Sequence, residues 1–286
     1  MTDPIRPDSI RLGLIGDNIA ASQSPRLHRL AGAQNGRRVV YDSLVPPALG
    51  RDFDTLFAEV ARGGYRGVNV TYPYKERAAG KVTIDDPLVR AIGAVNTVVF
   101  DAGGPHGHNT DYSGFIAAWR RVQGQAAPGT VLMIGAGGVG KAVAFGLLAL
   151  GMTRIRIADR DAEKAAALAA ALAAARPGLD ARSGTDAATL APGASGLVNC
   201  TPVGMTGHPG TPLPRAAMRG AAWAFDAVYT PVETEFLQDA AAEGLTVISG
   251  YELFFGQGVD AWAIFTGLPL DEARMRRELA EGRDVA

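Results

Sequence analysis

The sequence predicts an α/β protein with two domains, and three observations support this class. Strand-like apolar runs alternate with helical patterns over the first hundred or so residues. A second series begins at the buried-strand pattern Thr130–Ile134, which leads directly into the glycine-rich segment 135–140. Residues 124–129, which contain Pro128 and two glycines, separate the two series. We therefore expect an α/β domain joined to a Rossmann-type, doubly wound parallel sheet.

In the first domain, each expected element follows from a local pattern. Apolar residues at 53, 56, 57 and 60 have helical spacing. Pro25 fits the first turn of a helix with Ser24 as its N-cap, and Pro73 fits the start of another. Strands are expected at 12–15, 39–45, 67–70 and 94–100, the last returning toward Asn109 as a hairpin that turns at 101–104. Helices are expected after Ser24, over 53–61, from Pro73 and over 110–122.

The second domain repeats the strand–helix alternation. The alanine-rich run 162–175 has high helix propensity and is stopped by Pro177 and Gly178. Strands are expected at 130–134, 155–158, 196–199, 223–228 and 246–248. Helices are expected over 139–150, 162–175, 233–243, 252–266 and 271–281.

Composition excludes several functional classes. The chain has 286 residues, 47% of them hydrophobic and 20% charged, with a formal net charge of -1. That balance gives no general attraction to nucleic acid or anionic membranes. The single Cys200 excludes an internal disulfide, and neither a secretory signal nor a membrane-spanning run is apparent. We expect a cytoplasmic protein with a small-molecule substrate, present as a monomer or homodimer.

The segment Gly135-Ala136-Gly137-Gly138-Val139-Gly140 has the spacing and context of a dinucleotide-binding loop, since it follows a strand and opens a helix. Its glycines would permit a tight turn, close approach of pyrophosphate and close helix packing. Asp159 ends the next strand, where a carboxylate binds ribose hydroxyls and repels the 2′-phosphate of NADP. NAD is therefore the expected cofactor. Arg160 favours NADP as the alternative, and Asp159 as a helix N-cap is the structural alternative.

Polar groups also collect where strands of the first domain should end. Lys75 follows one strand and Asp111 lies at the end of the returning strand, so both would face a cleft beyond the carboxyl ends. A lysine beside a carboxylate can move the proton that accompanies hydride transfer between an alcohol and a ketone. Asn69, Thr71 and Asn96 would bind a polyhydroxylated substrate. Alternatively, Lys75 is a surface lysine and Asp111 a helix N-cap.

Ordered motifs along nearly the whole chain resemble the shikimate dehydrogenase family, and most closely its quinate/shikimate dehydrogenase branch. They are Ser22-Gln23-Ser24-Pro25, Asn69-Val70-Thr71-Tyr72-Pro73-Tyr74-Lys75, Gly93-Ala94-Val95-Asn96-Thr97, Asn109-Thr110-Asp111, the glycine loop, Asn199-Cys200-Thr201-Pro202-Val203-Gly204-Met205, Asp226-Ala227-Val228-Tyr229-Thr230-Pro231 and Gln257.

The resemblance implies a substrate domain, residues 1–111 and 252–286, and an NAD(P)-binding Rossmann domain, residues 112–251, with a cleft between them. It implies reversible hydride transfer at carbon 3 of shikimate or quinate, as in the shikimate pathway of aromatic amino acid biosynthesis. Lys75 and Asp111 match the family's catalytic pair. The substrate carboxylate would bind Ser22 and Ser24, its hydroxyls Thr71, Asn96 and Gln257, and Tyr229 would help close the site. The cofactor would contact the glycine loop, Asp159, Arg160, Thr201, Val203, Met205 and Val228.

Some positions depart from the family pattern. Asp159-Arg160-Asp161 replaces the Asn-Arg-Thr run of NADP-using members and resembles the NAD-using branch. Ser24 stands where some quinate-active members have Thr, which leaves the substrate preference open. Cys200 reads as a small apolar residue, and the pair His106 and His108 lacks the ligands for a metal site, so none is expected. An aminoshikimate or other cyclohexane-carboxylate dehydrogenase, a non-catalytic metabolite sensor and a different Rossmann enzyme are the alternatives.

Overall fold

The computed structural model describes residues 9–281 and divides the chain into two compact units. Unit 1 takes the chain up to Thr110 and from Gly258 onward, and unit 2 takes Asp111–Gln257. The sequence had placed these boundaries at 111/112 and 251/252. The second boundary lies further along the chain, within α10 (Gly250–Thr266). This helix is continuous, and its composition does not change at the boundary, so the sequence gives no signal there.

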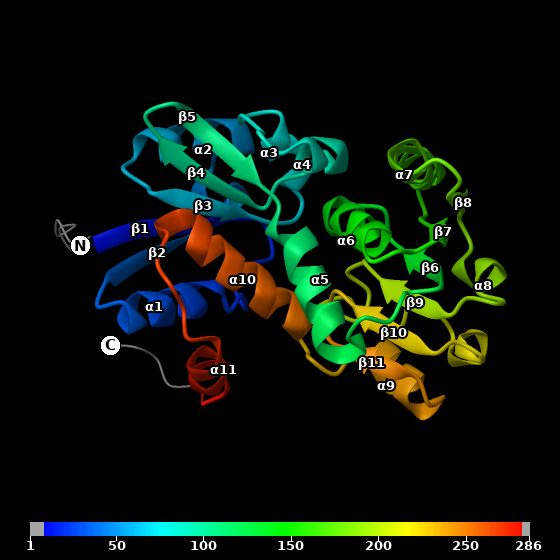
Figure 1. The fold of residues 1–286 in the computed structure, drawn as a ribbon. Helices are drawn as coiled ribbons and strands as arrows, with labels where there is room; N and C mark the ends of the chain where they lie inside the picture. The colour runs from blue at the N-terminus through cyan, green and yellow to red at the C-terminus, as the bar shows by residue number, and fades with distance from the viewer. Residues whose placement is uncertain (1–8, 282–286) are drawn as a thin grey trace. The chain divides into compact units, whose positions relative to one another are not determined.

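Unit 1 is built on a mixed sheet of five strands in the order β2-β1-β3-β4-β5 (Figure 1). β1 runs parallel to β2 and β3, whereas β4 is antiparallel to β3 and β5. The elements are β1 (Ser9–Ile15), α1 (Ser24–Gln34), β2 (Arg38–Leu44), η1 (Pro47–Leu49), α2 (Phe53–Arg62), β3 (Gly67–Val70), α3 (Lys75–Ala79), α4 (Pro87–Ile92), β4 (Thr97–Asp101), β5 (Gly104–His108), the end of α10 and α11 (Glu272–Ala280).

Helices cover both faces of this sheet, and the alternation of side chains along β3 shows how. Val68 and Val70 pack into a core shared with Phe53, Phe57 and other side chains of α2, α3 and α4. Gly67 points to the opposite face, where a Cβ would lie 2.6 Å from the Phe265 ring of α10. β3 is therefore buried on both sides, as its continuous apolar character indicates.

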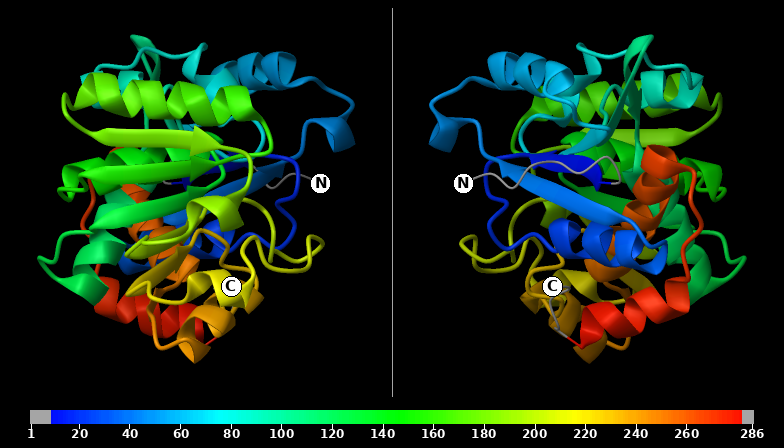
Figure 2. Two further views of the ribbon diagram at one scale, coloured as in Figure 1. Left: turned by 90° about the vertical axis from the view of Figure 1, so that its right-hand side faces the viewer. Right: turned by 90° about the vertical axis from the view of Figure 1, so that its left-hand side faces the viewer.

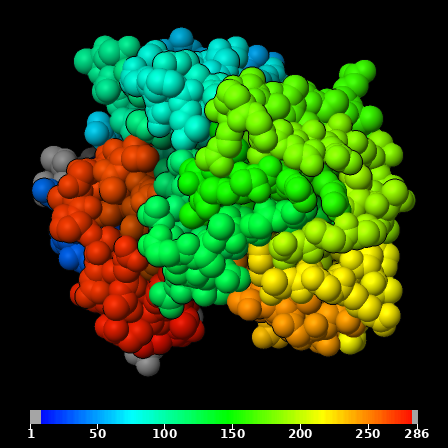
Figure 3. Space-filling model, turned by 45° about the vertical axis from the view of Figure 1, so that its right-hand side comes forward, coloured from blue at the N-terminus to red at the C-terminus, as the bar shows by residue number. Residues whose placement is uncertain are grey.

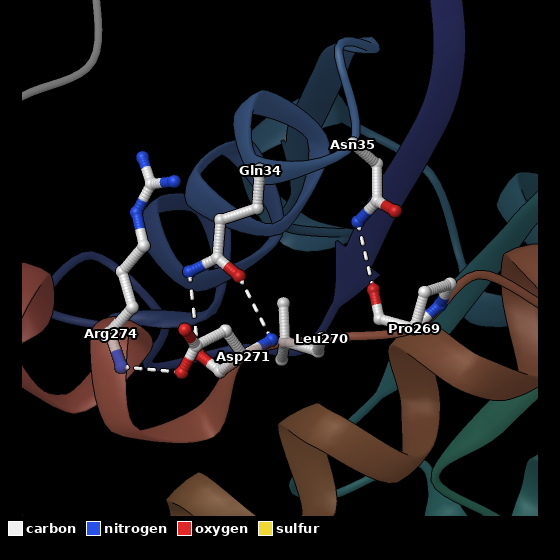
Figure 4. Close-up of a pocket in the computed structure, with 6 residues that line it drawn as sticks. All are labelled: Gln34, Asn35, Pro269, Leu270, Asp271 and Arg274. Carbon is white, nitrogen blue, oxygen red and sulfur yellow. Dashed lines mark hydrogen bonds between the residues drawn. The ribbon is translucent and has the colours of Figure 1, made fainter.

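The helix α11 docks on the end of α1 through amide side chains (Figure 4). Gln34 Oε1 accepts a hydrogen bond from the Asp271 backbone N–H at 3.1 Å, and Asn35 Nδ2 donates to the Pro269 carbonyl at 2.9 Å. The C-terminal part of unit 1, orange-red and red in Figure 3, forms a continuous surface. Asp271 also caps α11 by accepting from the Arg274 N–H.

Unit 2 is a parallel sheet of six strands in the order β11-β10-β9-β6-β7-β8, which run in one direction in Figure 2. This is the doubly wound order, with its switch point between β6 and β9. Its elements are α5 (Thr110–Gln123, whose first residue belongs to unit 1), β6 (Thr130–Ile134), α6 (Gly138–Ala149), β7 (Arg154–Ala158), α7 (Ala162–Ala175), β8 (Asp180–Gly184), α8 (Ala187–Leu190), β9 (Gly196–Asn199), η2 (Arg215–Met218), β10 (Trp223–Asp226), α9 (Glu235–Ala242), β11 (Thr246–Ile248) and the start of α10.

The predicted fold class is confirmed, and most predicted elements lie within two residues of their observed bounds. The β4–β5 hairpin pairs Asp101 with Gly104, as the turn residues indicated. The elements η1, α4, β8, α8 and η2 were not predicted from the sequence. These are short or largely polar, so they carry too few periodic apolar residues to be recognised.

Candidate functional site

One edge of the unit 1 sheet gathers the predicted substrate residues. β1, β3 and β5 end at this edge and β4 begins there, because β4 alone runs the opposite way. Thr71 follows β3 and donates its backbone N–H to the Ile15 carbonyl at 2.9 Å, while Asn96 precedes β4 and accepts from the Val70 N–H at 2.8 Å. The loops that carry Thr71 and Asn96 are therefore fixed by the ends of neighbouring strands.

Lys75 is the first residue of α3 and is half-buried. Its carbonyl accepts a hydrogen bond from the Val95 N–H at 3.0 Å, which ties the start of α3 to the strand loop that carries Asn96. The predicted helix start at Pro73 is wrong by two residues. The Tyr74 N–H bonds to the Thr71 carbonyl in a tight turn, and the helix begins only after that turn.

Ser22 and Ser24 lie together on the segment that enters α1. The Ser24 N–H donates to Ser22 Oγ at 3.3 Å, and Ser24 is buried. The prediction of Ser24 as the N-cap is wrong. The Gln23 carbonyl already accepts the helical bond from the Leu27 N–H, so Gln23 is the N-cap and Ser24 the first helical residue.

A buried polar network lies behind this edge, and Asn69 is its centre. Asn69 Oδ1 accepts from the Tyr41 hydroxyl at 2.9 Å, and Asn69 Nδ2 donates to Thr97 Oγ1 at 3.1 Å. Asn96 Oδ1 accepts from the Thr110 N–H at 2.8 Å, and Asn96 Nδ2 donates to Thr110 Oγ1 at 3.0 Å. We call these residues, with His28, the Asn69 network. It connects three of the motifs that the sequence singled out.

His28, which had no role in the sequence analysis, belongs to this network. Its ring stacks on Tyr41 with centroids 5.2 Å apart, and only 1% of the residue is exposed. Burial lowers the pKa of His28 to about 4, against the opposing effect of a hydrogen bond with the Asn69 side chain. His28 is therefore a neutral member of the network at physiological pH.

Asp111, Tyr229 and Gln257 all lie in unit 2, whereas Lys75 lies in unit 1. Asp111 is 5% exposed and occupies the first turn of α5, so it is neither the end of a strand nor an N-cap. Tyr229 stacks on Phe254 with centroids 4.8 Å apart, and Gln257 Nε2 donates to the Phe254 carbonyl at 3.0 Å. Phe254 therefore positions two of the predicted substrate residues.

The glycine loop has the shape that dinucleotide binding requires. Gly135 has φ of +100°, and a Cβ on Gly140 would lie 2.2 Å from the Gly135 carbonyl oxygen, so neither position accommodates a side chain. A Cβ on Gly137 would meet no described atom within 4 Å, which leaves its backbone open to a ligand. α6 begins at Gly138, so its first N–H groups face the space where a pyrophosphate would bind.

Asp159 is linked to this loop. Its Oδ2 accepts from the Ala136 N–H at 2.7 Å, and its Oδ1 accepts from the Asp161 N–H at 2.9 Å. The N-cap of α7 is Asp161, which accepts from the Glu163 and Lys164 N–H groups. The alternative that Asp159 caps that helix is therefore wrong. Arg160, next to it, is exposed.

A second buried network supports the remaining predicted cofactor residues. Asp226 Oδ1 accepts from Asn199 Nδ2 and the Val228 N–H, both at 2.9 Å, and Asp226 Oδ2 accepts from the Thr234 hydroxyl at 2.6 Å. Asn199 also binds the loop after β9 through Thr201 Oγ1, Thr201 N–H and the Val203 carbonyl. In the same loop, the half-buried Met205 donates its N–H to the Pro202 carbonyl. We call Asn199, Asp226, Thr234 and their partners the Asp226 network.

Burial raises the pKa of Asp226 to about 6, although its hydrogen bonds with Thr234, Val228 and Asn199 act in the opposite direction. From sequence alone, the Asp226 motif indicated only a resemblance to a family. Its signal was a carboxylate at the end of an otherwise apolar strand, which requires hydrogen-bonding partners when buried.

The remaining features are His106, Cys200 and one shallow pocket. His106 Nδ1 lies 3.1 Å from Asp85 Oδ2, and among residues 9–281 no group of three His, Cys, Asp or Glu side chains is placed to hold a metal. Cys200 is buried beside the glycine loop. The shallow pocket of Figure 4 contains none of the predicted site residues, and its amide groups dock α11. Within the described part of the chain, no helix has the length and apolarity to cross a membrane.

Comparisons with protein families match both units. Residues 14–98 match the model of the shikimate dehydrogenase substrate binding domain. Residues 131–248 match the model of the saccharopine dehydrogenase NADP binding domain. The two matched segments follow the division into an N-terminal α/β domain and a Rossmann-type sheet.

Curated relatives and solved structures span nearly the whole chain. The shikimate dehydrogenase (NADP(+)) of Pseudarthrobacter chlorophenolicus is 41% identical over 98% of this chain and 99% of its own. The quinate/shikimate dehydrogenase (NAD(+)) of Corynebacterium efficiens is 40% identical over 94% and 97%. The structure of quinate dehydrogenase from Corynebacterium glutamicum in complex with NAD has a TM-score of 0.87 at 37% identity, covering 96% of this chain and 99% of that one.

Proposed function

The chain belongs to the shikimate dehydrogenase family, and from this premise we propose that it transfers a hydride between NAD(P) and carbon 3 of shikimate, quinate or both. One observation carries the assignment of substrate to unit 1. Ser22, Ser24, Thr71, Lys75 and Asn96 are all placed by the loops at one edge of its sheet. Such an edge is where ligands of α/β proteins bind.

The serines and amides supply the groups that a hydroxylated cyclic acid requires. Ser22 and Ser24 would hold the substrate carboxylate. Asn96 uses its Oδ1 and one Nδ2 hydrogen within the Asn69 network, which leaves a second Nδ2 hydrogen to donate to a hydroxyl. Thr71, Tyr229 and Gln257 would complete the contacts with the ring. The network fixes the Asn96 amide before substrate binds, which lowers the entropic cost of binding.

Lys75 and Asp111 would form the pair responsible for proton transfer. In the oxidation direction the hydroxyl proton passes to Lys75, and in the reduction direction Lys75 returns it to the ketone oxygen. The resemblance assigns Asp111 as the acidic member of this catalytic pair. A bound nicotinamide accepts or supplies the hydride. Removal of the proton prevents a positive charge from developing on the oxygen as the hydride leaves.

NAD is proposed as the preferred cofactor because of Asp159. Its two oxygens each accept one backbone hydrogen bond, so each retains a lone pair for a ribose hydroxyl. The same carboxylate would repel a 2′-phosphate. Arg160 opposes this preference because a guanidinium binds phosphate well. The glycine loop, Thr201, Val203, Met205 and Val228 would contact the rest of the cofactor.

Initial rates of NAD and NADP reduction with shikimate and with quinate test this proposal. We expect activity with at least one acid and faster reduction of NAD. A preference for NADP would show that Arg160 outweighs Asp159. Absence of activity in all four combinations, with a folded protein that binds NAD, would reject shikimate and quinate as substrates. That result would favour a related cyclohexane-carboxylate dehydrogenase or a metabolite sensor.

A further inference from the structure

Two side chains outside the proposed site join the loops that carry it. The Tyr74 hydroxyl donates to Asp17 Oδ1 at 2.7 Å. Tyr74 immediately precedes Lys75, and Asp17 follows β1 on the segment that leads to Ser22 and Ser24. The hydrogen bond thus joins the loop that precedes Lys75 to the segment that leads to Ser22 and Ser24.

The Tyr74 ring is held by the core of unit 1. It stacks on Phe53 with centroids 4.8 Å apart and 11° between the planes, and Phe53 is 1% exposed. The position of the hydroxyl is therefore set by packing at the start of α2. Burial, with a smaller contribution from the hydrogen bond to Asp17, raises the pKa of Tyr74 to about 12, so the phenol remains a donor.

Backbone contacts bring the same two loops together. The Asp17 N–H donates to the Tyr72 carbonyl at 3.1 Å, next to the bond from Thr71 to Ile15. Gly16 lies between them, and a Cβ there would be 2.3 Å from Thr71 Cγ2. Because the two loops approach so closely, the distance that the Tyr74–Asp17 hydrogen bond must bridge is short and fixed.

Further hydrogen bonds connect Asp17 to the segment that carries Ser22 and Ser24. The Ile19 N–H donates to the Asp17 carbonyl and the Ser22 N–H donates to the Ile19 carbonyl, both at 3.0 Å. Ser22 Oγ then accepts from the Ser24 N–H. On the other side, Tyr74 is bonded directly to Lys75. A shift at either end of the Tyr74–Asp17 bond would therefore move one loop relative to the other.

We propose that Tyr74 and Asp17 form a positioning pair, which sets the placement of Lys75 relative to Ser22 and Ser24; this rests on the proposed function of those three residues. The substrate carboxylate and its reacting hydroxyl belong to one rigid ring, so the distance between their binding groups must match the ring. A misplaced Lys75 would slow proton transfer even when substrate binds.

Steady-state kinetics of Tyr74→Phe, Asp17→Ala and Asp17→Asn test the pair. Tyr74→Phe keeps the ring on Phe53 and removes only the hydroxyl. We expect Tyr74→Phe and Asp17→Ala each to lower kcat/KM for the cyclic acid about tenfold, with NAD affinity unchanged. Asp17→Asn should restore most activity, because the amide oxygen still accepts the hydrogen bond. The double variant Tyr74→Phe/Asp17→Ala should be no slower than either single variant.

Tyr65→Phe is the matched control. Its hydroxyl donates to Asp42 Oδ2 at 2.6 Å in the same unit, and no proposed site residue is involved. Wild-type kinetics in Tyr74→Phe, an equal loss in Tyr65→Phe, or equal losses in Asp17→Asn and Asp17→Ala would each overturn the positioning pair. Lys75→Ala separates the two hypotheses. If it is inactive while Tyr74→Phe is normal, only the pair fails; if it retains full turnover, the proposed role of Lys75 fails.

Discussion

The Asn69 network of unit 1 and the Asp226 network of unit 2 have the same structural role, but they are built from groups of different charge. Each is buried beside the carboxyl ends of central strands and fixes loops that carry proposed site residues. The first consists of amides, hydroxyls and a neutral His28. The second is centred on a carboxyl group whose pKa is raised to about 6 by burial.

The difference shows what each unit requires of its supporting groups. Asn69 and Asn96 both donate and accept, so they can join hydroxyls and backbone groups in series without a buried charge. Asp226 only accepts when it is ionised, and it draws three donors from three segments to a single point. The neutral network aligns a row of residues along a sheet edge, whereas the carboxyl network gathers three segments around one group.

The largest expected effect is on turnover, and it distinguishes catalysis by unit 1 from cofactor binding by unit 2. Lys75→Ala should reduce kcat about a thousandfold, because it removes the group that transfers the proton. NAD affinity should remain at the wild-type value, since the cofactor residues belong to unit 2. Stopped-flow turnover and equilibrium NAD titration of the same preparation measure both quantities. Turnover near that of the wild type would remove Lys75 from the catalytic pair.

The two networks should also respond to acid in opposite directions. His28 has a pKa of about 4 when folded and 6.5 as the reference value, so its contribution to stability is lost as pH falls from 6.5 toward 4. Asp226 has a pKa of about 6 when folded and 3.8 as the reference value, so its contribution is lost as pH rises from 3.8 toward 6. Each change is on the order of 3 kcal/mol.

Urea unfolding of His28→Gln and Asp226→Asn between pH 4 and 6.5 reveals these contributions separately. Relative to the wild type, His28→Gln should become progressively less stable as pH rises, and Asp226→Asn progressively more stable. Signals from each unit should be followed separately, because the two units need not unfold together. Parallel pH profiles for the wild type and both variants would show that neither group titrates as its burial indicates.

A smaller effect distinguishes Asp159, the proposed ribose-binding residue, from the nearby Asp161. Asp159→Ala should weaken NAD binding about tenfold and leave the KM for the cyclic acid unchanged, because it removes the proposed ribose acceptor and the bond to Ala136. Fluorescence titration with NAD and NADP measures the change. Equal NAD affinity in the variant and the wild type would restrict Asp159 to a structural role.

The smallest expected effect is the control for that experiment. Asp161→Ala removes the N-cap of α7 and should lower the free energy of unfolding by about 1 kcal/mol. Its NAD affinity should be unchanged, although Asp161 is only two residues from Asp159. Equal losses of NAD affinity in both variants would show that the local fold, and not the Asp159 carboxylate, controls binding.

Strands and the glycine loop could be predicted from sequence because local patterns determine them. β3, β6 and β9 have the predicted bounds, since each is a short apolar run between turn residues. The glycines at 135 and 140 occupy positions where a side chain would be strained or would clash. Such requirements are visible in one short segment.

The supporting networks could not be predicted in the same way. Tyr41, Asn69 and His28 come from three separate elements, and only the parallel register of β1 with β2 and β3 brings them together. Ser24 was misread as an N-cap because capping depends on which carbonyl accepts the first helical bond, and Gln23 provides it. Asp17 and Tyr74 likewise pair only through the sheet.

Transfer of deuterium from carbon 3 of labelled shikimate or quinate tests the central claim most directly. The enzyme would be incubated with NAD and the acid carrying deuterium at carbon 3, and the reduced cofactor analysed by mass spectrometry. We expect the deuterium to appear in the reduced nicotinamide, because the hydride passes directly from that carbon. Reduced cofactor without the label would place the reaction at another carbon and contradict the account.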